Sequence, residues 1–276
     1  MILLEDYEDS FTGQRGFLGR ELIPHLEQQG HDVTTSNIDY SSDFNVNQFL
    51  RNREFDYILH AAIRGGRRIR KDTADDFYNN IRMFEILAST GIPMITFCSG
   101  AAYGREGDIN NAPESAVGKR IPTDYYGFAK SLITQRARHL SHVQILRFFN
   151  VFGPTSQKDM FTSANIRNYI NRKEIVVFQD KLMDFFGIDD TKTVVDLYLK
   201  KAKILPKEIN LVYEDNLMLT DVASMINELS DYTVPVNIVK NGMQNAYCGS
   251  GYLLNTMGIG LKGLKHQLRS TYEHLI

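Results

Sequence analysis

A tyrosine and a lysine four residues apart, Tyr126 and Lys130, have the types and the spacing needed for acid–base chemistry. Side chains four residues apart on a helix lie on the same face. Free tyrosine titrates at about pH 10, and a fixed neighbouring cation favours the phenolate, which brings the proton within reach of chemistry near neutrality. Any amphipathic helix can carry a half-buried ring beside a solvated lysine, so the weight of this pair depends on the other motifs.

The second motif is a glycine-rich turn, in which Gly13, Gly16 and Gly19 are spaced by three and open a helical pattern. Glycine lets backbone amides approach a pyrophosphate, and the helix N-terminus adds partial positive charge there. The spacing differs from the G-x-G-x-x-G fingerprint, so a plain turn is the alternative. An acidic stretch, 5–11, separates the turn from the apolar run 2–4, so either a short strand precedes a long loop or the acidic residues enter the sheet.

The rest of the chain alternates between short apolar runs and longer helical patterns, which is typical of a parallel sheet covered by helices on both faces. This pattern predicts a Rossmann-type α/β fold with a doubly wound parallel sheet and a small C-terminal substrate-binding lobe. The Rossmann domain is expected to span 1–153 and the lobe most of 154–276, with 185–205 returning to the Rossmann domain. The expected strands are 32–36, 57–60, 94–98, 143–148, 175–178 and 209–213, and the expected helices 46–53, 73–90, 123–140, 159–172, 190–203, 220–229 and 263–275.

Composition fits a globular cytoplasmic enzyme, since the chain has 276 residues, 43% of them hydrophobic, and a net charge of −2. A net charge of this size and sign indicates no broad basic surface for binding nucleic acid. The basic run 64–71 is a solvated loop or, beside a nucleotide, a phosphate contact. Two distant cysteines, Cys98 and Cys248, argue against a disulfide framework and a metal site. The sequence shows no membrane span and no signal peptide.

Taken together, the motifs resemble the extended short-chain dehydrogenase/reductase family, which includes nucleotide-sugar epimerases, dehydratases and reductases. The resemblance covers nearly the whole chain. It rests on six motifs in order, which are Thr12-Gly13-x-x-Gly16-x-x-Gly19, His60-Ala61-Ala62, Asn79-Asn80-Ile81, Ser99-Gly100-Ala101-Ala102-Tyr103-Gly104, Tyr126-x-x-x-Lys130 and Arg147-Phe148-Phe149-Asn150-Val151-Phe152-Gly153-Pro154.

The resemblance implies a catalytic set of Ser99, Tyr126 and Lys130. Ser99 and Tyr126 would hydrogen-bond the reacting carbonyl or hydroxyl, while Lys130 would hold the nicotinamide ribose and lower the tyrosine pKa. From the residues alone, Ser99 could simply end a strand, and a core histidine is the favoured interpretation of His60. The residues expected at the cofactor are Gly13, Arg15, Gly16, Phe17, Leu18, Gly19, Asn37, Ala61, Ala62, Asn80 and Lys130, and those at the substrate are Ala101, Asn150 and Lys181.

Departures from the family pattern narrow the range of reactions expected of this chain. The dehydratase branch carries an Asp-Glu pair shortly after the catalytic serine or threonine, where this chain has Gly100 and Ala101. The GDP-fucose synthase branch uses a cysteine at the place of Ala101, together with a histidine, and no histidine lies between His142 and His266. Met183 stands where an arginine usually binds the nucleotide phosphates, so Lys181 or another cation must substitute, or the substrate is not an ordinary nucleotide-sugar.

These observations favour an NADP(H)-dependent reductase of a 4-keto-6-deoxy nucleotide-sugar. An NAD-dependent C4 epimerase is the first alternative, and a non-catalytic dinucleotide-sensing module is the second. NADP is preferred because Asn37, at the expected ribose position, carries no charge to repel a 2′-phosphate, and Arg15 is placed to pair with one. Asp39, two residues later, keeps NAD open. A homodimer is left open as the assembly.

Overall fold

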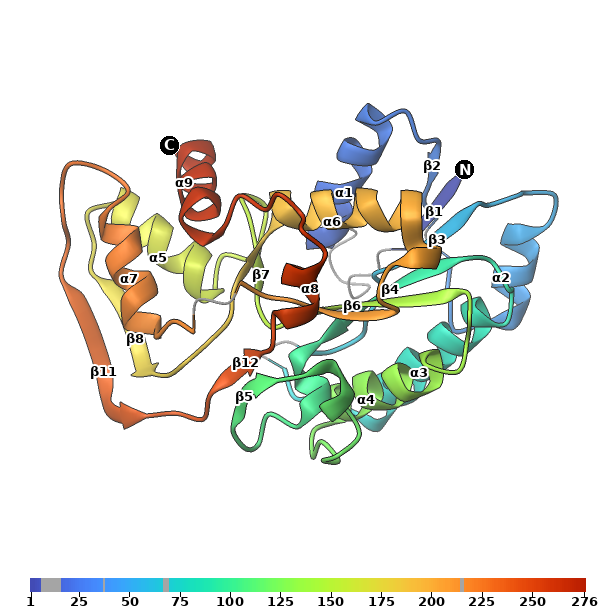
Figure 1. Ribbon diagram of the computed structural model, residues 1–276, viewed down its shortest axis with the longest axis horizontal. Coiled ribbons are helices and arrows are strands. Elements are labelled where there is room, and N and C mark those ends of the chain that lie inside the picture. The colour runs from blue at the N-terminus through green and yellow to red at the C-terminus, as the bar shows by residue number, and fades with distance from the viewer. Residues whose placement is uncertain (6–15, 37, 67–69, 214–215) are drawn as a thin grey trace. The chain divides into compact units, whose positions relative to one another are not determined.

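The computed structural model describes residues 1–5, 16–36, 38–66, 70–213 and 216–276 and shows an α/β protein with a six-stranded parallel sheet flanked by helices (Figure 1). This arrangement confirms the fold class predicted from the alternating apolar runs. The strand order is β10-β6-β4-β3-β1-β2. In this order the strands are β10 (Glu208–Leu211), β6 (Val143–Phe148), β4 (Met94–Ser99), β3 (Tyr57–His60), β1 (Ile2–Glu5) and β2 (Val33–Thr34).

The inner strands are the ones that the sequence predicted most closely. In β4 and β6 nearly every residue is buried, as expected for strands that helices cover on both faces. The register between β3 and β4 pairs Ile58 with Met94, and that between β1 and β2 pairs Ile2 with Val33. The outer strand β2 is shorter than the predicted 32–36, because only two of its residues pair with β1.

Four helices accompany these strands: α1 (Phe17–Gln28), α2 (Asp43–Leu50), α3 (Ala74–Ala88) and α4 (Tyr125–Ala137). Figure 1 shows α1 on one side of the sheet and α3 and α4 side by side on the other. Side chains fix where the helices begin. Thr73 and Asp76 form a capping box at α3, and Asp124 accepts a 2.8 Å hydrogen bond from the Gly127 amide at α4.

Contacts within the described residues divide the chain into two compact units. The first contains Met1–Gly104, Glu114–Arg147 and Leu199–Ile209, and the second contains Arg105–Pro113, Phe148–Tyr198 and Asn210–Ile276. The domain boundaries expected from the sequence remain a prediction. Short 3₁₀ helices occur at Gly100–Tyr103, Glu114–Ala116 and Ala202–Ile204.

The second unit is built from pairs of parallel strands and five helices. The strand pairs are β5 (Ile109–Ala112) with β12 (Tyr247–Gly249), β7 (Val151–Phe152) with β9 (Phe186–Gly187), and β8 (Ile175–Asp180) with β11 (Val236–Met243). The described helices are α5 (Phe161–Ile170), α6 (Ile188–Lys201), whose last three residues belong to the first unit, α7 (Leu219–Asn227), α8 (Tyr252–Thr256) and α9 (Leu264–Leu275). The sequence did not predict β11, because this strand is exposed along its whole length and lacks a buried alternating face.

The core of the second unit is rich in aromatic rings. Tyr169 and Tyr232 stack with their centroids 4.4 Å apart, and the hydroxyl of Tyr169 donates a 2.7 Å hydrogen bond to the carbonyl of Tyr232. A buried tyrosine normally finds such a partner for its hydroxyl.

Among the described residues, no helix is both long and apolar enough to cross a bilayer. Cys98 and Cys248 are both free and buried, and burial raises the pKa of the Cys248 thiol to about 12.

One buried ion pair joins β6 and β10. Arg147 has no exposed surface, and its guanidinium donates to Glu208 and to the hydroxyl of Tyr103. Burial alone would lower the pKa of Arg147, but the neighbouring Tyr103, Cys98 and Glu208 raise it above its ordinary value, so the side chain stays a cation. Arg138 also bonds Glu208, at 2.7 Å. The single carboxylate therefore bonds two guanidinium groups at once.

Replacing Glu208 by glutamine should lower the free energy of unfolding by about 3–5 kcal/mol, because it leaves the Arg147 cation buried without its counter-ion. The measurement is urea unfolding at pH 7. Glu85→Gln is the matched control, since Glu85 pairs with Arg136 where both side chains are well exposed, and its loss should cost less than about 1 kcal/mol. Equal effects of the two substitutions would contradict the prediction.

Candidate active site

Ser99 is the last residue of β4, where the buried strand meets a 3₁₀ turn. Its hydroxyl oxygen accepts a hydrogen bond from the amide of Ala101 at 3.2 Å, and its side chain is half-buried. This bond caps the turn and fixes the serine at the carboxyl end of a central strand. Ligands of parallel α/β sheets bind at that edge. Ser99 therefore has both a structural role and a location suited to catalysis.

The helix that carries Tyr126 lies directly against this turn. Gly127 follows the tyrosine, and a Cβ atom at that position would lie only 2.7 Å from the carbonyl oxygen of Ala101. No ordinary side chain tolerates so close an approach, so the glycine is what lets the first turn of α4 reach the end of β4. Tyr126 itself is half-buried in that first turn. The structure thus brings the tyrosine helix and the serine turn together.

Lys130 is buried one turn further along α4. Its ammonium group donates a 2.7 Å hydrogen bond to the carbonyl of Phe97, two residues before Ser99. Burial lowers the pKa of Lys130, because the charged form loses its hydration, while the nearby Cys98 acts in the opposite direction. The Cys98 thiol also lies 3.2 Å from the Thr134 hydroxyl on the same helix. Lys130 therefore ties α4 to the backbone of β4.

Asn80 supports the loop that follows β3. Its side-chain amide both accepts from the Arg64 amide and donates to the Arg64 carbonyl, each at 2.8 Å. The side chain is almost completely buried in α3. Ala61 and Ala62 lie between β3 and this clamp. Asn80 therefore holds the backbone of this loop, and its expected place at the cofactor remains a prediction.

The described part of the expected cofactor site is the start of α1. Gly16 is the N-cap, and Phe17, Leu18 and Gly19 form the first turn. A glycine N-cap has no side chain to occupy the first amide groups of the helix, so these donors suit an anion such as a pyrophosphate. The residues present therefore fit a dinucleotide. Three further expected cofactor residues lie outside the described residues, namely Gly13, Arg15 and Asn37.

Asp39 lies just beyond β2, in the region expected to meet the adenosine ribose. Its carboxylate accepts hydrogen bonds from the hydroxyl of Ser41 at 2.6 Å and from the Ser41 amide at 3.0 Å, and it lies 3.6 Å from the Arg64 guanidinium. The Ser41 hydroxyl contributes most to a lowered pKa of Asp39, and Arg64 acts in the same direction. The carboxylate is therefore ionised and already has partners.

The residues expected at the substrate belong to both units. Ala101, in the first unit, is fully buried in the turn after Ser99. Asn150, in the second unit, is buried, and its side-chain oxygen has no hydrogen-bond partner among the residues that the structure describes. An unsatisfied buried oxygen is costly, which makes it a candidate acceptor for a ligand group. The ammonium of Lys181 lies 5.7 Å from the centroid of the Tyr247 ring.

Three further residues, His60, Arg64 and Arg70, have structural partners. His60 is buried and its ring lies 6.3 Å from that of Phe84, as expected for a core histidine. Within the basic run, Arg64 pairs with Asp39 and Arg70 pairs with Asp76 at 2.9 Å. Sequence reasoning missed one contributor to the site, Gly127. The only available signal for it was a glycine within a functional motif.

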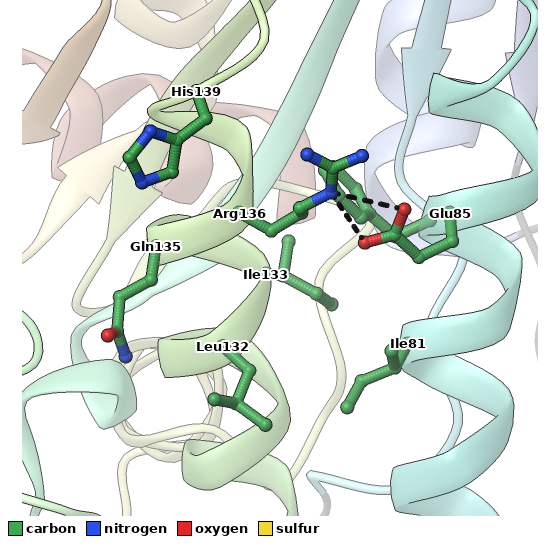
Figure 2. A pocket seen from close by; sticks show the side chains of 8 residues that line it. Ile81, Glu85, Leu132, Ile133, Gln135, Arg136 and His139 are labelled. Carbon is green, nitrogen blue, oxygen red and sulfur yellow. Dashed lines mark hydrogen bonds and ion pairs between the residues drawn. The ribbon is translucent and has the colours of Figure 1, made fainter.

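A pocket between α3 and α4 lies apart from this chemistry. Figure 2 shows Ile81 and Ile133 directed toward one another from the two helices, with the ion pair of Glu85 and Arg136 beside them. The other residues that line it are Phe84, Leu132, Gln135 and His139. None of the predicted site residues lines it. We therefore do not assign it to catalysis.

The fold and the positions of the candidate site residues are those expected of a dinucleotide-binding protein of the short-chain dehydrogenase type. Residues 11–211 match the model of the NAD dependent epimerase/dehydratase family, and the chain belongs to that family. From this membership we expect the activity of an NAD(P)-dependent oxidoreductase or epimerase of the extended short-chain dehydrogenase type. The match confirms the resemblance inferred from the six motifs.

The individual relatives share only a modest part of their sequence with this chain. The chain is 25% identical over 193 residues to the "Uncharacterized UDP-glucose epimerase YtcB" of Bacillus subtilis (strain 168), an alignment covering 63% of this chain and 58% of the relative. The chain thus spans about three fifths of that protein's length.

Among solved structures, UDP-glucose 4-epimerase of Thermotoga maritima, with UDP-glucose, is 17% identical, with a TM-score of 0.79 over 99% of this chain and 98% of the other. GDP-mannoheptose C4 reductase of Campylobacter jejuni, with NADP bound, is 15% identical, with a TM-score of 0.78 and coverage of 99% and 97%. At such low identity these two similarities establish the fold alone.

The burial of Lys130 leads to a test of its protonation. Because the folded-state pKa is below the ordinary value of 10.5, folding disfavours the charged form at neutral pH, and this cost disappears as the pH rises through the folded-state pKa toward 10.5. The unfolding free energy of the natural protein should therefore rise relative to that of Lys130→Met between the folded-state pKa and 10.5. Urea unfolding of both proteins as a function of pH measures the difference between their unfolding free energies, and a difference that changes in the other direction would contradict the lowered pKa of Lys130.

Proposed function

We propose that the protein is an NADP(H)-dependent reductase of a 4-keto-6-deoxy nucleotide-sugar, with Tyr126 as the proton donor. The observation that carries this proposal is the seating of α4 against the end of β4, where Gly127 meets the carbonyl of Ala101 and Lys130 bonds that of Phe97. This seating fixes the phenol-bearing helix beside the Ser99 turn. A hydroxyl and a phenol held at the carboxyl end of a central strand suit the reduction of a carbonyl.

Each residue of the catalytic set has one task in this proposal. A bound nicotinamide would supply the hydride to the carbonyl carbon. Tyr126 donates its hydroxyl proton to the oxygen that becomes an alcohol, and the Ser99 hydroxyl orients that oxygen. Lys130 holds α4 in position and favours the phenolate that remains after proton transfer. The proton then returns to Tyr126 from solvent, which completes the cycle.

The expected binding residues are assigned to the two ligands as proposals. The dinucleotide is expected at the start of α1 and along the loops after β2 and β3, with Asn80 bracing the latter through Arg64. Asn150 supports a substrate site through its buried side-chain oxygen, and Ala101 and Lys181 are retained as further contacts. A homodimer stays open as the assembly.

The residues after Ser99 argue against two related reactions. Gly100 and Ala101 form a buried turn without a carboxylate, so elimination of water would lack its acid and base. Ala101 also lacks the thiol that the GDP-fucose synthase branch uses for its own ring epimerisation. A C4 epimerase remains the second candidate, because the Thermotoga maritima structure is named a UDP-glucose 4-epimerase and the Bacillus subtilis relative a UDP-glucose epimerase. An epimerase returns its hydride and consumes no cofactor, whereas a reductase oxidises one NADPH for each product.

Replacing Tyr126 by phenylalanine should lower kcat by about 10²-fold or more while leaving NADPH affinity unchanged, since general acid catalysis typically contributes about 10²–10⁴-fold. The assay follows NADPH absorbance with a panel of 4-keto nucleotide-sugars. Asn150→Ala is the contrasting variant, because loss of a substrate contact should raise KM with little change in cofactor binding. Near-normal turnover in Tyr126→Phe would refute the role of the phenol.

NADP(H) is preferred to NAD for two reasons. The sequence offers an uncharged Asn37 and a nearby Arg15, both of which lie outside the described residues. The structure adds that Asp39 has its carboxylate paired with Arg64, which reduces its repulsion of a 2′-phosphate. Solved neighbours contain NADP in some cases and NAD in others. The choice for this chain is therefore a proposal.

Titration with NADPH and NADH tests this choice. NADPH should bind more tightly, and Arg15→Ala should weaken it by about 1–3 kcal/mol, the range for a hydrogen bond to a charged group. Asp39→Asn should leave NADH binding weak and unchanged, because the proposal gives Asp39 no ribose contact. Tighter binding of NADH by the unmodified protein, lost in Asp39→Asn, would instead identify Asp39 as the ribose acceptor.

A further inference from the structure

The loop after β3 contains two consecutive glycines in a backbone conformation that other residues rarely adopt. Gly65 has a φ of +79° and Gly66 a φ of +76°. For residues with a Cβ atom this left-handed region is costly. Any other residue would be strained at these two adjacent positions, which begin three residues after Ala62, one of the alanines expected at the cofactor.

This loop is held from two directions. The buried side chain of Asn80 clamps the Arg64 backbone with two hydrogen bonds of 2.8 Å. Two residues later, the amide of Gly66 donates a 2.7 Å hydrogen bond to the carboxylate of Asp72. Asn80 therefore fixes the loop at Arg64, and Asp72 fixes it at Gly66.

What Gly66 contacts is the ring of Tyr126. A Cβ atom built on Gly66 would lie 2.8 Å from both Cδ2 and Cε2 of that ring and 3.1 Å from Cζ, the carbon that carries the hydroxyl. All three distances are shorter than normal carbon–carbon contacts of about 3.5–4.0 Å. The bare backbone of Gly66 therefore packs along one edge of the phenol, and any side chain there would occupy the space of the ring.

Two other glycines allow the effect of this contact to be distinguished from the effect of the backbone conformation. A Cβ on Gly65 would meet the Asp72 carboxylate at 2.4 Å, and the ring of Tyr126 is not among its nearest neighbours. Gly91 has a φ of +73°, close to that of Gly66, but a Cβ there would meet nothing within 4 Å. Alanine at position 91 thus imposes the same backbone strain without any contact.

We propose that Gly66 is a positioning residue for Tyr126, because its backbone forms a fixed wall that sets where the phenol hydroxyl lies. The inference rests on the proposed function, in which that hydroxyl is the proton donor. With the loop clamped by Asn80 and Asp72, a side chain at position 66 displaces the ring rather than the loop. Misplacing a reacting group by about 1 Å can cost about 10²-fold in rate.

The first test needs no substrate. With 3-fluorotyrosine incorporated at position 126 of the full chain, the ¹⁹F resonance and its titration midpoint report the surroundings of the phenol. Gly66→Ala should shift both, whereas Gly91→Ala should shift neither. Asp72→Ala, which removes the acceptor of the Gly66 amide, should shift them in part, and Asp72→Asn, which keeps a side-chain oxygen, should restore them. Unchanged spectra in Gly66→Ala would overturn the proposal.

The second test is a double-mutant cycle on turnover with NADPH and a 4-keto nucleotide-sugar. Gly66→Ala should lower kcat about tenfold or more and leave KM and NADPH affinity within about twofold. In the Tyr126→Phe background it should cause no further loss, because the hydroxyl it positions is gone. An equal further loss would show that Gly66 acts independently of the phenol. Normal turnover of Tyr126→Phe itself would reject the proposed function, while the fluorine spectra would still decide the contact.

Discussion

The arrangement of the first unit depends on how closely α4 approaches the end of β4. Two contacts of different kinds enforce it. Gly127 removes the side chain that would clash with the carbonyl of Ala101, and Lys130 donates a hydrogen bond to the carbonyl of Phe97. The first permits the approach and the second holds it. Phe97, Ser99 and Ala101 are alternate residues along β4 and its turn. The tyrosine helix is therefore fixed relative to the serine by backbone contacts on either side of it.

This arrangement creates an electrostatic conflict at Lys130. A cation that favours the phenolate must itself remain protonated, yet burial lowers the pKa of this lysine. The hydrogen bond to Phe97 offsets part of the lost hydration, because a carbonyl oxygen stabilises the ammonium form. Arg147, also fully buried, resolves the same conflict differently, through the carboxylate of Glu208. The structural cation Arg147 thus has a full counter-ion, whereas the candidate catalytic cation Lys130 bonds the dipole of a backbone carbonyl.

Much of the first unit could be predicted from its sequence because its signals are local. Apolar runs located β3, β4 and β6, and the Tyr-x-x-x-Lys spacing placed two candidate residues on one helix, α4. The second unit was harder to predict. Its strand β11 is exposed, β7 and β9 have two residues each, and β5 pairs with β12, which lies far along the chain. Such pairings are decided by tertiary contacts that periodicity does not report.

Glycines mark the limit of this kind of prediction. Their chemistry is the same at every position, so the sequence cannot distinguish Gly91, which faces open space, from Gly66, which packs on a tyrosine ring. Only the partner across the gap gives a glycine its role, and that partner, Tyr126, lies 60 residues away along the chain. Acid–base side chains were recognisable from their types, but the backbone atoms that hold them in place were not. A site of this kind is therefore specified as much by absent side chains as by reactive ones.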